Sequence, residues 1–447
     1  MSPSSAVGLP AFRWEGAIRA LGASDRRALF ERGTSDGAGV REQTAAIVAR
    51  VRRDGDAALR TMAVEFDGVA LEALEVPRHE WTRALDTLDA PLRRAMERSA
   101  DNVQRVHRAF LPVAQECESE PGIVVGRRPD PLGRVGVYAP GGRAAYPSSV
   151  LMGVVPARVA GVSEIVVCSP PIRESGRPSP VVLAAAALAG ADRVFALGGA
   201  GAIAAMAFGT ESVPRADRIV GPGNAYVAEA KLQVSSVVAI DSPAGPSELL
   251  VLCDETADPA GVARELLAQA EHDPLAAVVA VTTHESLAQA IAEAIAEAIA
   301  ELLPSQPRGE IIAASLAGRG AILWSDSLDD TIEFANAYAA EHLQLVVADP
   351  DAVLARVRNA GTVFVGPSAS VAFGDYMTGA NHVLPTGGLA RSYSGLSTLD
   401  FMRWTTYQRV SPSAAARLAD EVAAFADAEG LPGHAAAARA WHAGGTL

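Results

Sequence analysis

Alternating strand and helix patterns predict an α/β protein with two Rossmann-like parallel-sheet units, N-terminal helices before them and a C-terminal helical segment after them. Three observations support this prediction. From residue 131 onward, short β-branched runs alternate with alanine-rich helical stretches. The predicted strands end in glycine or proline turns. The chain has 447 residues and 49% apolar side chains, enough to bury the cores of two or more domains.

The N-terminal segment, residues 1–130, shows helical periodicity and almost no strand signal. We predict helices over 40–66 and 78–110, the second of them preceded by Pro77. The character of the sequence changes sharply at Pro129-Asp130-Pro131.

Residues 131–240 form the first predicted α/β unit. Its strands are expected at 134–138, 164–168, 193–197 and 218–220, and its helices begin near Pro147, Pro178, Ala200 and Asn224. Ligands of open parallel sheets bind outside the carboxyl ends of the strands. We therefore expect this unit to hold a nucleotide or a similar ligand.

Residues 241–378 form the second predicted unit. Its strands are expected at 248–253, 276–282, 321–324, 343–347 and 362–365, with helices at 259–271, 290–303 and 328–340 between them. Residues 379–447 are loop-rich up to Ser394 and then helical to the end.

Composition excludes several classes of protein. The net charge of −14, with no stripe of Lys and Arg to offset it, argues against a nucleic-acid or anionic-membrane partner and favours a small-molecule substrate. The N-terminus lacks a secretory pattern, and the apolar runs are shorter than the ~20 residues that span a bilayer, so we expect a cytoplasmic protein. Cys117, Cys168 and Cys253 are widely spaced and match neither a disulfide framework nor a zinc finger.

Residues suited to metal binding and proton transfer gather in the second half of the chain. Four of the eight histidines lie beside a carboxylate or carboxamide, in Gln269-x-x-His272, Glu341-His342, Asp375-x6-His382 and Glu429-x4-His434. Gln269 and His272 share a face of a predicted helix, and imidazole and carboxylate groups suit zinc. A solvent-exposed Gln-x-x-His pair is the structural alternative.

Glu341 and His342 lie where a predicted helix meets a strand, so both side chains can face one cavity. A histidine suits removal of a hydroxyl proton, and a glutamate in a dry site suits activation of water. The structural alternative is a Glu and a His placed at a helix end by the helix dipole.

The segment 194–205 places Gly199-x-Gly201-x-x-Ala204 directly after a strand, which matches the dinucleotide fingerprint in context. The next acidic residue, Asp217, precedes a strand instead of ending one, where a ribose ligand belongs. The match is weak support for a phosphate-bearing ligand, because close glycine packing explains it equally well.

Taken in order, these segments resemble the histidinol dehydrogenase family, zinc- and NAD-dependent enzymes of the last two steps of histidine biosynthesis. The matching strings are VGVYAPGG (135–142), YPSSVLM (146–152), AFGTESVP (207–214), GPGNAYV (221–227), PAGPSELLV (243–251), LLAQAEHDP (266–274), AEHLQL (340–345) and GDYMTGANHVLPT (374–386). They cover nearly the whole chain past about residue 30, in the family's order.

The resemblance implies a role for each matching residue. It gives Gln269, His272, Asp375 and His434 as zinc ligands, His342 as general base, Glu341 as the residue that activates water, Ser247, His382 and Glu429 as substrate contacts, and Tyr138 and Asn224 as NAD contacts. It also implies a homodimer in which the C-terminal segment, with His434 and Glu429, reaches the partner's site. The N-terminal helices are expected to pack on the second α/β unit.

Two departures from the family pattern stand out. Gly201 replaces a glutamine associated with NAD, and TTYQ (405–408) does not resemble the common family text. A lost carboxamide hydrogen bond costs about 0.5–1.5 kcal/mol, so NAD could bind more weakly or differently.

The function predicted is a four-electron oxidation of L-histidinol, through the aldehyde, to L-histidine, with two NAD+ consumed. A related zinc dehydrogenase of the same fold acting on another polyol or a sulfonated alcohol is the first alternative, favoured by Gly201 and TTYQ. A zinc hydrolase would have no use for the nucleotide-type unit. A thiol-based aldehyde dehydrogenase would need a nucleophilic cysteine, and none of the three cysteines lies in a context that favours a thiolate.

Overall fold

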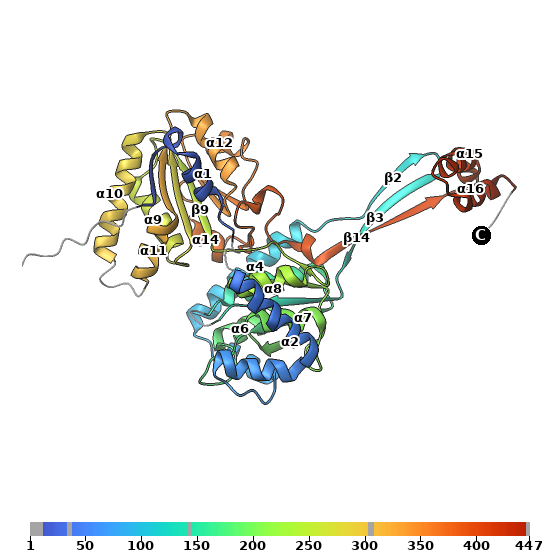
Figure 1. Cartoon of the computed structure of the whole chain (residues 1–447), viewed down its shortest axis with the longest axis horizontal. Helices are drawn as coiled ribbons and strands as arrows, with labels where there is room; N and C mark the ends of the chain where they lie inside the picture. Colours follow the sequence, from blue (N-terminus) through green and yellow to red (C-terminus); the bar gives the residue numbers. More distant parts are fainter. Residues whose placement is uncertain (1–11, 34–37, 142–144, 303–307, 444–447) are drawn as a thin grey trace, which may run out of the picture.

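Two α/β units and a long arm make up the chain (Figure 1). The computed structural model describes residues 12–33, 38–141, 145–302 and 308–443. Residues 1–11, which supported the prediction that no secretory segment is present, lie outside this range. The mixed α/β fold with two parallel sheets confirms the predicted fold class.

The first unit contains a five-stranded parallel sheet in the order β6-β5-β4-β7-β8. Its strands are β4 (Arg134–Tyr138), β5 (Glu164–Ser169), β6 (Arg193–Ala196), β7 (Arg218–Val220) and β8 (Ala239–Ile240). Its helices are α5 (Pro147–Ala160), α6 (Pro180–Ala189), α7 (Gly199–Phe208) and α8 (Ala225–Val234). Strands β4 to β7 are buried on both faces except at their first residues, which explains why they appear in the sequence as continuous apolar runs.

Residues 14–30 pack on the second unit. The main N-terminal helices instead cover this first sheet, so for them the prediction of packing on the second unit is wrong. They are α2 (Ala38–Met62), which continues into the π-helical turn η2 (Ala63–Asp67), α3 (Arg78–Asp86) and α4 (Ala90–Ala109). Helix α2 contacts α7 and α8, α3 contacts α6, and α4 contacts α5. Helices α6 and α7 consist largely of alanine and glycine, and their shallow surfaces face α3 and α2, which contribute Trp81 and Leu59 to the shared core.

The second unit contains a six-stranded parallel sheet in the order β1-β11-β10-β9-β12-β13. Its strands are β1 (Trp14–Ala17), β9 (Glu248–Cys253), β10 (Ala277–Thr282), β11 (Gly320–Trp324), β12 (His342–Val346) and β13 (Thr362–Val365). Its helices are α1 (Ala23–Phe30), α9 (Pro259–Ala270), α10 (Glu285–Leu302), α11 (Gly309–Arg319), α12 (Leu328–Tyr338), α13 (Pro350–Leu354) and α14 (Val371–Tyr376). The edge strand β1 comes from the region predicted to lack strands, and it pairs with β11.

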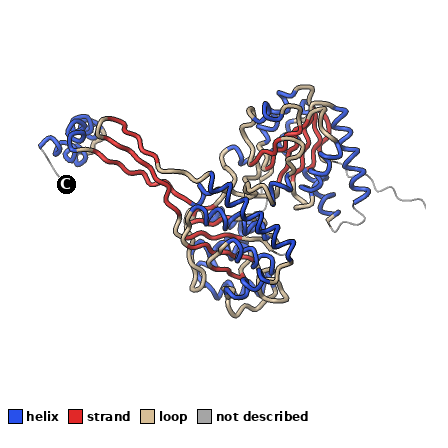
Figure 2. The backbone as a smooth tube through the Cα atoms, turned by 180° about the vertical axis from the view of Figure 1, so that it is seen from behind, coloured by secondary structure: helices blue, strands red, loops and turns tan. Residues whose placement is uncertain are grey.

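The arm is a three-stranded antiparallel sheet that projects away from both units (Figures 1 and 2). Strands β2 (Gln115–Glu120), β3 (Ile123–Pro131) and β14 (Met402–Val410) form it, and α15 (Pro412–Ala428) and α16 (Pro432–Arg439) lie at its tip. Helical structure was predicted for most of these strand residues, which is wrong. Strand β2 is exposed along its whole length, so no buried face imposes an alternating apolar pattern on its sequence.

Contacts between side chains of neighbouring strands, and not a buried core, stabilise the arm. The Tyr407 ring lies against Gly126, where an added Cβ would come within 2.3 Å of it, and the Arg127 guanidinium lies 4.5 Å from the Trp404 ring centroid. The unusual TTYQ string belongs to β14. It therefore shapes the arm.

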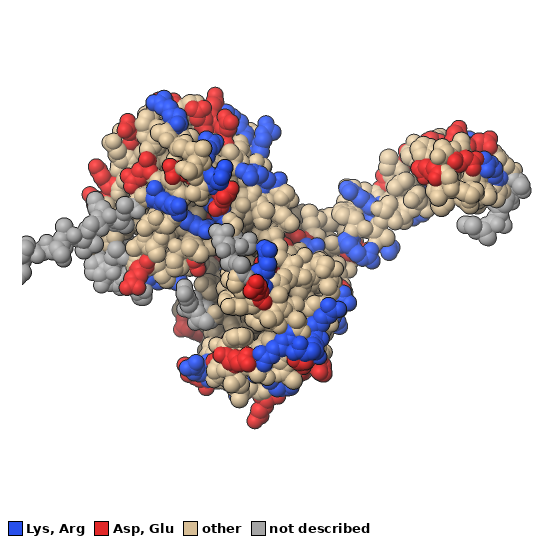
Figure 3. All heavy atoms as spheres, in the orientation of Figure 1, with Lys and Arg blue, Asp and Glu red and all other residues tan. Residues whose placement is uncertain are grey.

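Surface charge is mixed. On the face shown in Figure 3, basic and acidic side chains are interspersed over both units and over the arm tip. None of the helices among the described residues has the length and apolar character needed to cross a membrane.

Candidate active site

Glu341 and His342 lie together at the start of β12, in the second unit. Ala339, with a left-handed φ of 54°, ends α12 and turns the chain into the strand. The His342 Nδ1 atom lies 3.5 Å from Glu341 Oε2, and both side chains are buried. Both residues therefore lie at a helix–strand junction, as predicted, and their side chains are close together.

Glu248, the first residue of the neighbouring strand β9, positions both members of this pair. Its backbone N–H donates to Glu341 Oε2 at 2.7 Å, and its carbonyl oxygen lies 2.9 Å from His342 Nδ1. A carbonyl oxygen can only accept a hydrogen bond, so Nδ1 carries the hydrogen of neutral His342. The basic atom of neutral His342 is then Nε2. The Nε2 atom has no hydrogen-bond partner among the described residues.

Arg32 neutralises Glu248 in the interior. Its Nε and Nη2 atoms donate to the two carboxylate oxygens of Glu248, each at 2.9 Å, and its guanidinium lies 3.5 Å from the Tyr338 ring centroid. The Glu248 carboxylate also accepts from the backbone N–H of Gly387 at 2.7 Å. One buried ion pair thus connects the N-terminal segment, β9 and the loop after α14 behind the pair Glu341–His342.

Sequence reasoning missed both Arg32 and Glu248. The signal was a charged residue at the head of the apolar run ELLVLC, because an ionised side chain in a fully buried strand requires a buried counter-ion. The counter-ion itself lies 216 residues away in the sequence. Its identity could not be read from the local pattern.

Removing the Arg32 charge tests this arrangement. Arg32→Met leaves the Glu248 carboxylate buried without a cation, and we expect the free energy of unfolding to fall by about 3–5 kcal/mol, measured by urea denaturation. In the double variant Arg32→Met/Glu248→Gln no charge remains, and most of the loss should be recovered. Equal destabilisation of the single and double variants would contradict the role given to the ion pair.

The titration behaviour of the site follows from its burial and its charges. Burial raises the pKa of Glu341. Burial also works to lower the pKa of His342, but the carboxylates of Glu341 and Asp375 outweigh it and raise the pKa to about 10. For Asp375, burial is outweighed by the His342 imidazole, and the pKa is lowered. Without a cation in the site, these carboxylates favour the protonated imidazole. A metal ion held by Asp375 would offset that attraction and favour neutral His342.

Two of the four predicted metal ligands, His272 and Asp375, interact with His342, and Gln269 lies one helical turn before His272. Gln269 is on α9, and His272 lies just past the end of that helix. The backbone N–H of His272 donates a hydrogen bond to the Gln269 carbonyl oxygen at 3.2 Å. Asp375 is on α14, where its Oδ1 lies 3.6 Å from His342 Nε2 and its carboxylate interacts with the His272 and His382 rings. A hydrogen bond of 3.1 Å from the Val371 N–H to the Glu265 carboxylate ties α14 to α9.

The donor set fits a divalent ion in part. The Gln269 side chain is 2% exposed, and neither of its amide atoms has a hydrogen-bond partner in the described part of the chain. A buried amide without a partner is costly, so it points to a missing ligand. Within one chain, however, the described residues contain no group of three or more His, Cys, Asp and Glu side chains that could hold a metal.

Gly374 precedes Asp375 in the short helix α14, and a close contact requires the glycine there. An added Cβ would come within 2.4 Å of the Phe364 ring, and this close approach sets the helix against β13. The His382 Nδ1 atom lies 2.8 Å from the Asp375 carbonyl oxygen, and Ser247 directly precedes β9, so both predicted substrate contacts border the site.

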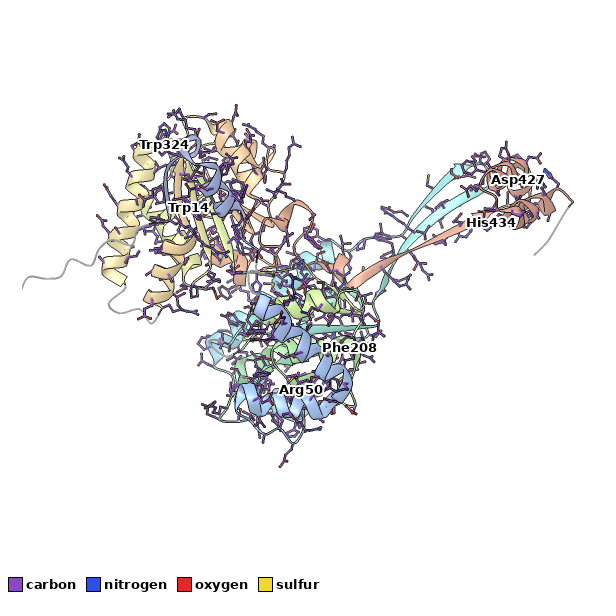
Figure 4. All side chains as sticks on the ribbon, viewed as in Figure 1. Trp14, Arg50, Phe208, Trp324, Asp427 and His434 are labelled. Atoms are coloured by element: carbon purple, nitrogen blue, oxygen red, sulfur yellow. The ribbon has the colours of Figure 1, made fainter. Side chains whose placement is uncertain are left out.

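His434 and Glu429 do not join the site within one chain. Glu429 caps the end of α15 and His434 is in the first turn of α16, at the tip of the arm. Figure 4 shows His434 far from the unit that contains Trp14 and Trp324, which is the unit with the other ligand candidates. Within one chain, His434 therefore stays apart from the other three predicted ligands.

The predicted cofactor contacts lie at the carboxyl edge of the first sheet. The Tyr138 hydroxyl, at the end of β4, accepts the Gly199 N–H at 3.0 Å, and burial raises the pKa of Tyr138 to about 12. Asn224 caps α8, accepting the N–H groups of Tyr226 and Val227 at 3.1 and 3.2 Å. This leaves the α8 N-terminus and the Asn224 amide group beside the end of β4.

Gly201 is buried below α2. An added Cβ there would lie 3.3 Å from Met62 Sδ and 3.5 Å from Leu59 Cδ2. The side chain of a glutamine at this position would start in tight contact with α2. In this chain the glycine therefore allows close packing between α2 and α7. The departure at 201 thus has a packing explanation.

The family model described as histidinol dehydrogenase matches residues 30–441. The histidinol dehydrogenase of Methanosarcina mazei is 48% identical over 418 residues, covering 93% of this chain and 95% of that protein. That of Halobacterium salinarum is 50% identical over 416 residues, covering 93% and 96%. The crystal structure of histidinol dehydrogenase from Elizabethkingia anophelis matches with a TM-score of 0.91 at 33% identity, covering 97% of this chain and 99% of that chain.

The paired parallel sheets, the buried Glu–His pair and these similarities define the chain as an oxidoreductase of the dehydrogenase class. The chain belongs to the histidinol dehydrogenase family. The resemblance inferred from the sequence is confirmed.

Proposed function

We propose that this chain oxidises L-histidinol, through the bound aldehyde, to L-histidine, and that it uses zinc and two molecules of NAD+ in each cycle. The observation that supports this most is the buried Gln269 amide, which has no partner among the described residues and lies three residues before His272, whose ring interacts with Asp375 and His342. It combines a ligand site and a proton-transfer pair in one place.

The chain's own residues supply the proton transfers. Nε2 of His342 takes the proton of the substrate hydroxyl as hydride leaves the carbinol carbon for NAD+, the second substrate. Glu341 then takes a proton from water as the water oxygen attacks the aldehyde carbon, and protonated His342 returns its proton to the aldehyde oxygen to give the hydrate. Neutral His342 then takes a hydroxyl proton of the hydrate as the second hydride leaves for a second NAD+. Because both residues are buried, the aldehyde is held away from bulk water between the two steps.

Gln269, His272 and Asp375 would hold zinc together with His434 from a second copy of the chain. When bound, zinc supplies a positive charge that orients the nitrogen and oxygen donors of the substrate. The proposal therefore includes a homodimer in which each arm reaches the other subunit. Exposed apolar residues at the arm tip, Phe425 at 73% and Leu431 at 41%, suit such a contact.

Two observations weaken the alternatives. Gly201 packs against α2 and TTYQ lies in the arm, so neither departure indicates a different substrate. Burial raises the pKa of Cys168 and raises that of Cys253 to about 12, so these thiols are poor nucleophiles at neutral pH.

The direct test is NADH formation from L-histidinol and NAD+, followed by absorbance with the full chain. We expect two NADH per histidinol, loss of activity after chelation and recovery on addition of Zn2+. A panel of other amino alcohols, polyols and sulfonated alcohols is run in parallel. Turnover of one of these, with none of histidinol by the zinc-loaded protein, would contradict the proposal.

A further inference from the structure

Lys231 is the single lysine among the 38 Lys and Arg residues of the chain. It lies on α8 with a side chain that is 3% exposed, and it forms an ion pair with Asp241, whose side chain is 2% exposed. Arginine occupies every other such cationic position in the sequence. A compact ammonium group and a planar guanidinium are not interchangeable in an enclosed site, so a lysine retained only here indicates a specific geometric requirement.

The ion pair holds one glycine from both sides. Lys231 Nζ donates to the Gly221 carbonyl oxygen at 3.1 Å, and Asp241 Oδ2 accepts the Gly221 N–H at 2.7 Å. Gly221 has a φ of +117°, and an added Cβ would lie 2.1 Å from the Tyr138 carbonyl oxygen. The ion pair thus fixes the turn after β7 in close contact with the end of β4.

This turn leads directly into the predicted cofactor contacts. It covers residues 221–224 and ends at Asn224, the N-cap of α8, while Tyr138 lies on its other side. Asp241 directly follows β8, where the chain leaves the first sheet for the second unit. Lys231 and Asp241 therefore connect three segments: the turn, helix α8 that follows it, and the start of the segment that leads from β8 to Glu248.

We propose that Lys231 and Asp241 are positioning residues for NAD+. They hold the 221–224 turn in the conformation that receives the dinucleotide between Tyr138 and Asn224, and bound NAD+ in turn restrains the pair. This inference rests on the proposed function only in taking NAD+ as the ligand of the first unit. It does not depend on the alcohol oxidised.

Because Lys231 is the single lysine, amine acetylation of the full zinc-loaded chain reports on this one side chain. Peptide mass spectrometry gives its acetylation rate with and without NAD+, with a free lysine-containing peptide in the same tube as the reference. We expect slow acetylation of Lys231 and a further slowing of about tenfold with NAD+ at about ten times its Kd, since a ligand suppresses opening by a factor of one plus the ratio of its concentration to its Kd. A rate equal to that of the reference peptide, or one unchanged by NAD+, would overturn the proposal.

Variants separate positioning from folding. Lys231→Met/Asp241→Asn removes both charges together and avoids a lone buried charge, and Lys231→Arg keeps the charge but changes its shape. For each we expect the Kd and KM for NAD+ to rise by about tenfold, as expected for a lost charge-assisted hydrogen bond, with kcat changed little. The control is Arg41→Met, which removes an ion pair of 3.7 Å between α2 and Glu229 of α8 without touching the turn.

The binding measurement uses NAD+ alone, by calorimetry, and needs no alcohol substrate. Unchanged NAD+ affinity in both Lys231 variants would refute the positioning role even if histidinol is oxidised. Weakened affinity in both, with Arg41→Met unaffected, supports the role even if histidinol is not the substrate.

Discussion

Glu341→Gln is expected to abolish oxidation of the aldehyde while the protein stays folded. The glutamine has the same shape, and its carbonyl oxygen can still accept the Glu248 N–H that Glu341 Oε2 accepts at 2.7 Å. It cannot take a proton from water. Because a general base contributes about 10²–10⁴-fold to the rate, aldehyde oxidation should fall by that factor.

The first oxidation requires no water, so it distinguishes this role from a general loss of activity. With histidinol we expect Glu341→Gln to form at most one NADH per site, and with added aldehyde none at a useful rate. The control is Glu333→Gln, an exposed glutamate on the preceding helix α12. Full oxidation of the aldehyde by Glu341→Gln would remove Glu341 from the mechanism.

The two sheets could be predicted because their strands are buried on both faces. Strands β9 and β10 appear as the runs ELLVLC and AVVAVT, and every residue of both is buried. Periodicity also located the N-terminal helices. It shows which side of a helix is apolar but not what covers it, and so the partner of α2 was predicted wrongly.

Within the candidate site, residues that act through their own side chains were predictable by type. Gln269, His272, Glu341, His342 and Asp375 carry donors suited to a metal or a proton, and the structure places them in the second unit. Residues that act by positioning others were not. Glu248 positions Glu341 and His342 through hydrogen bonds of its backbone N–H and carbonyl groups. A pattern of side chains in the sequence cannot predict such a backbone role.

Exchange of the arm between subunits should appear as restored activity in a mixed dimer. His434→Ala and Glu341→Gln should each be inactive as homodimers, His434→Ala because a metal ligand is lost, with a drop of at least about 100-fold. In the heterodimer, the His434→Ala subunit keeps an intact Glu341 and receives an intact arm from its partner. One of the two sites is then complete, so an isolated heterodimer should show about half of wild-type activity.

A pair of arm variants provides the matched control. Glu429→Gln and His434→Ala both lie at the arm tip, on α15 and α16, so their heterodimer has no complete site and should stay inactive. Failure of the first mixture to regain activity, with both dimers formed, would mean that the arm does not serve the partner. Gln269, His272 and Asp375 would then hold zinc as three protein ligands, with the fourth position taken by water or substrate. The homodimer part of the proposal stands or falls on this experiment, whereas the assignments of Glu341 and His342 do not.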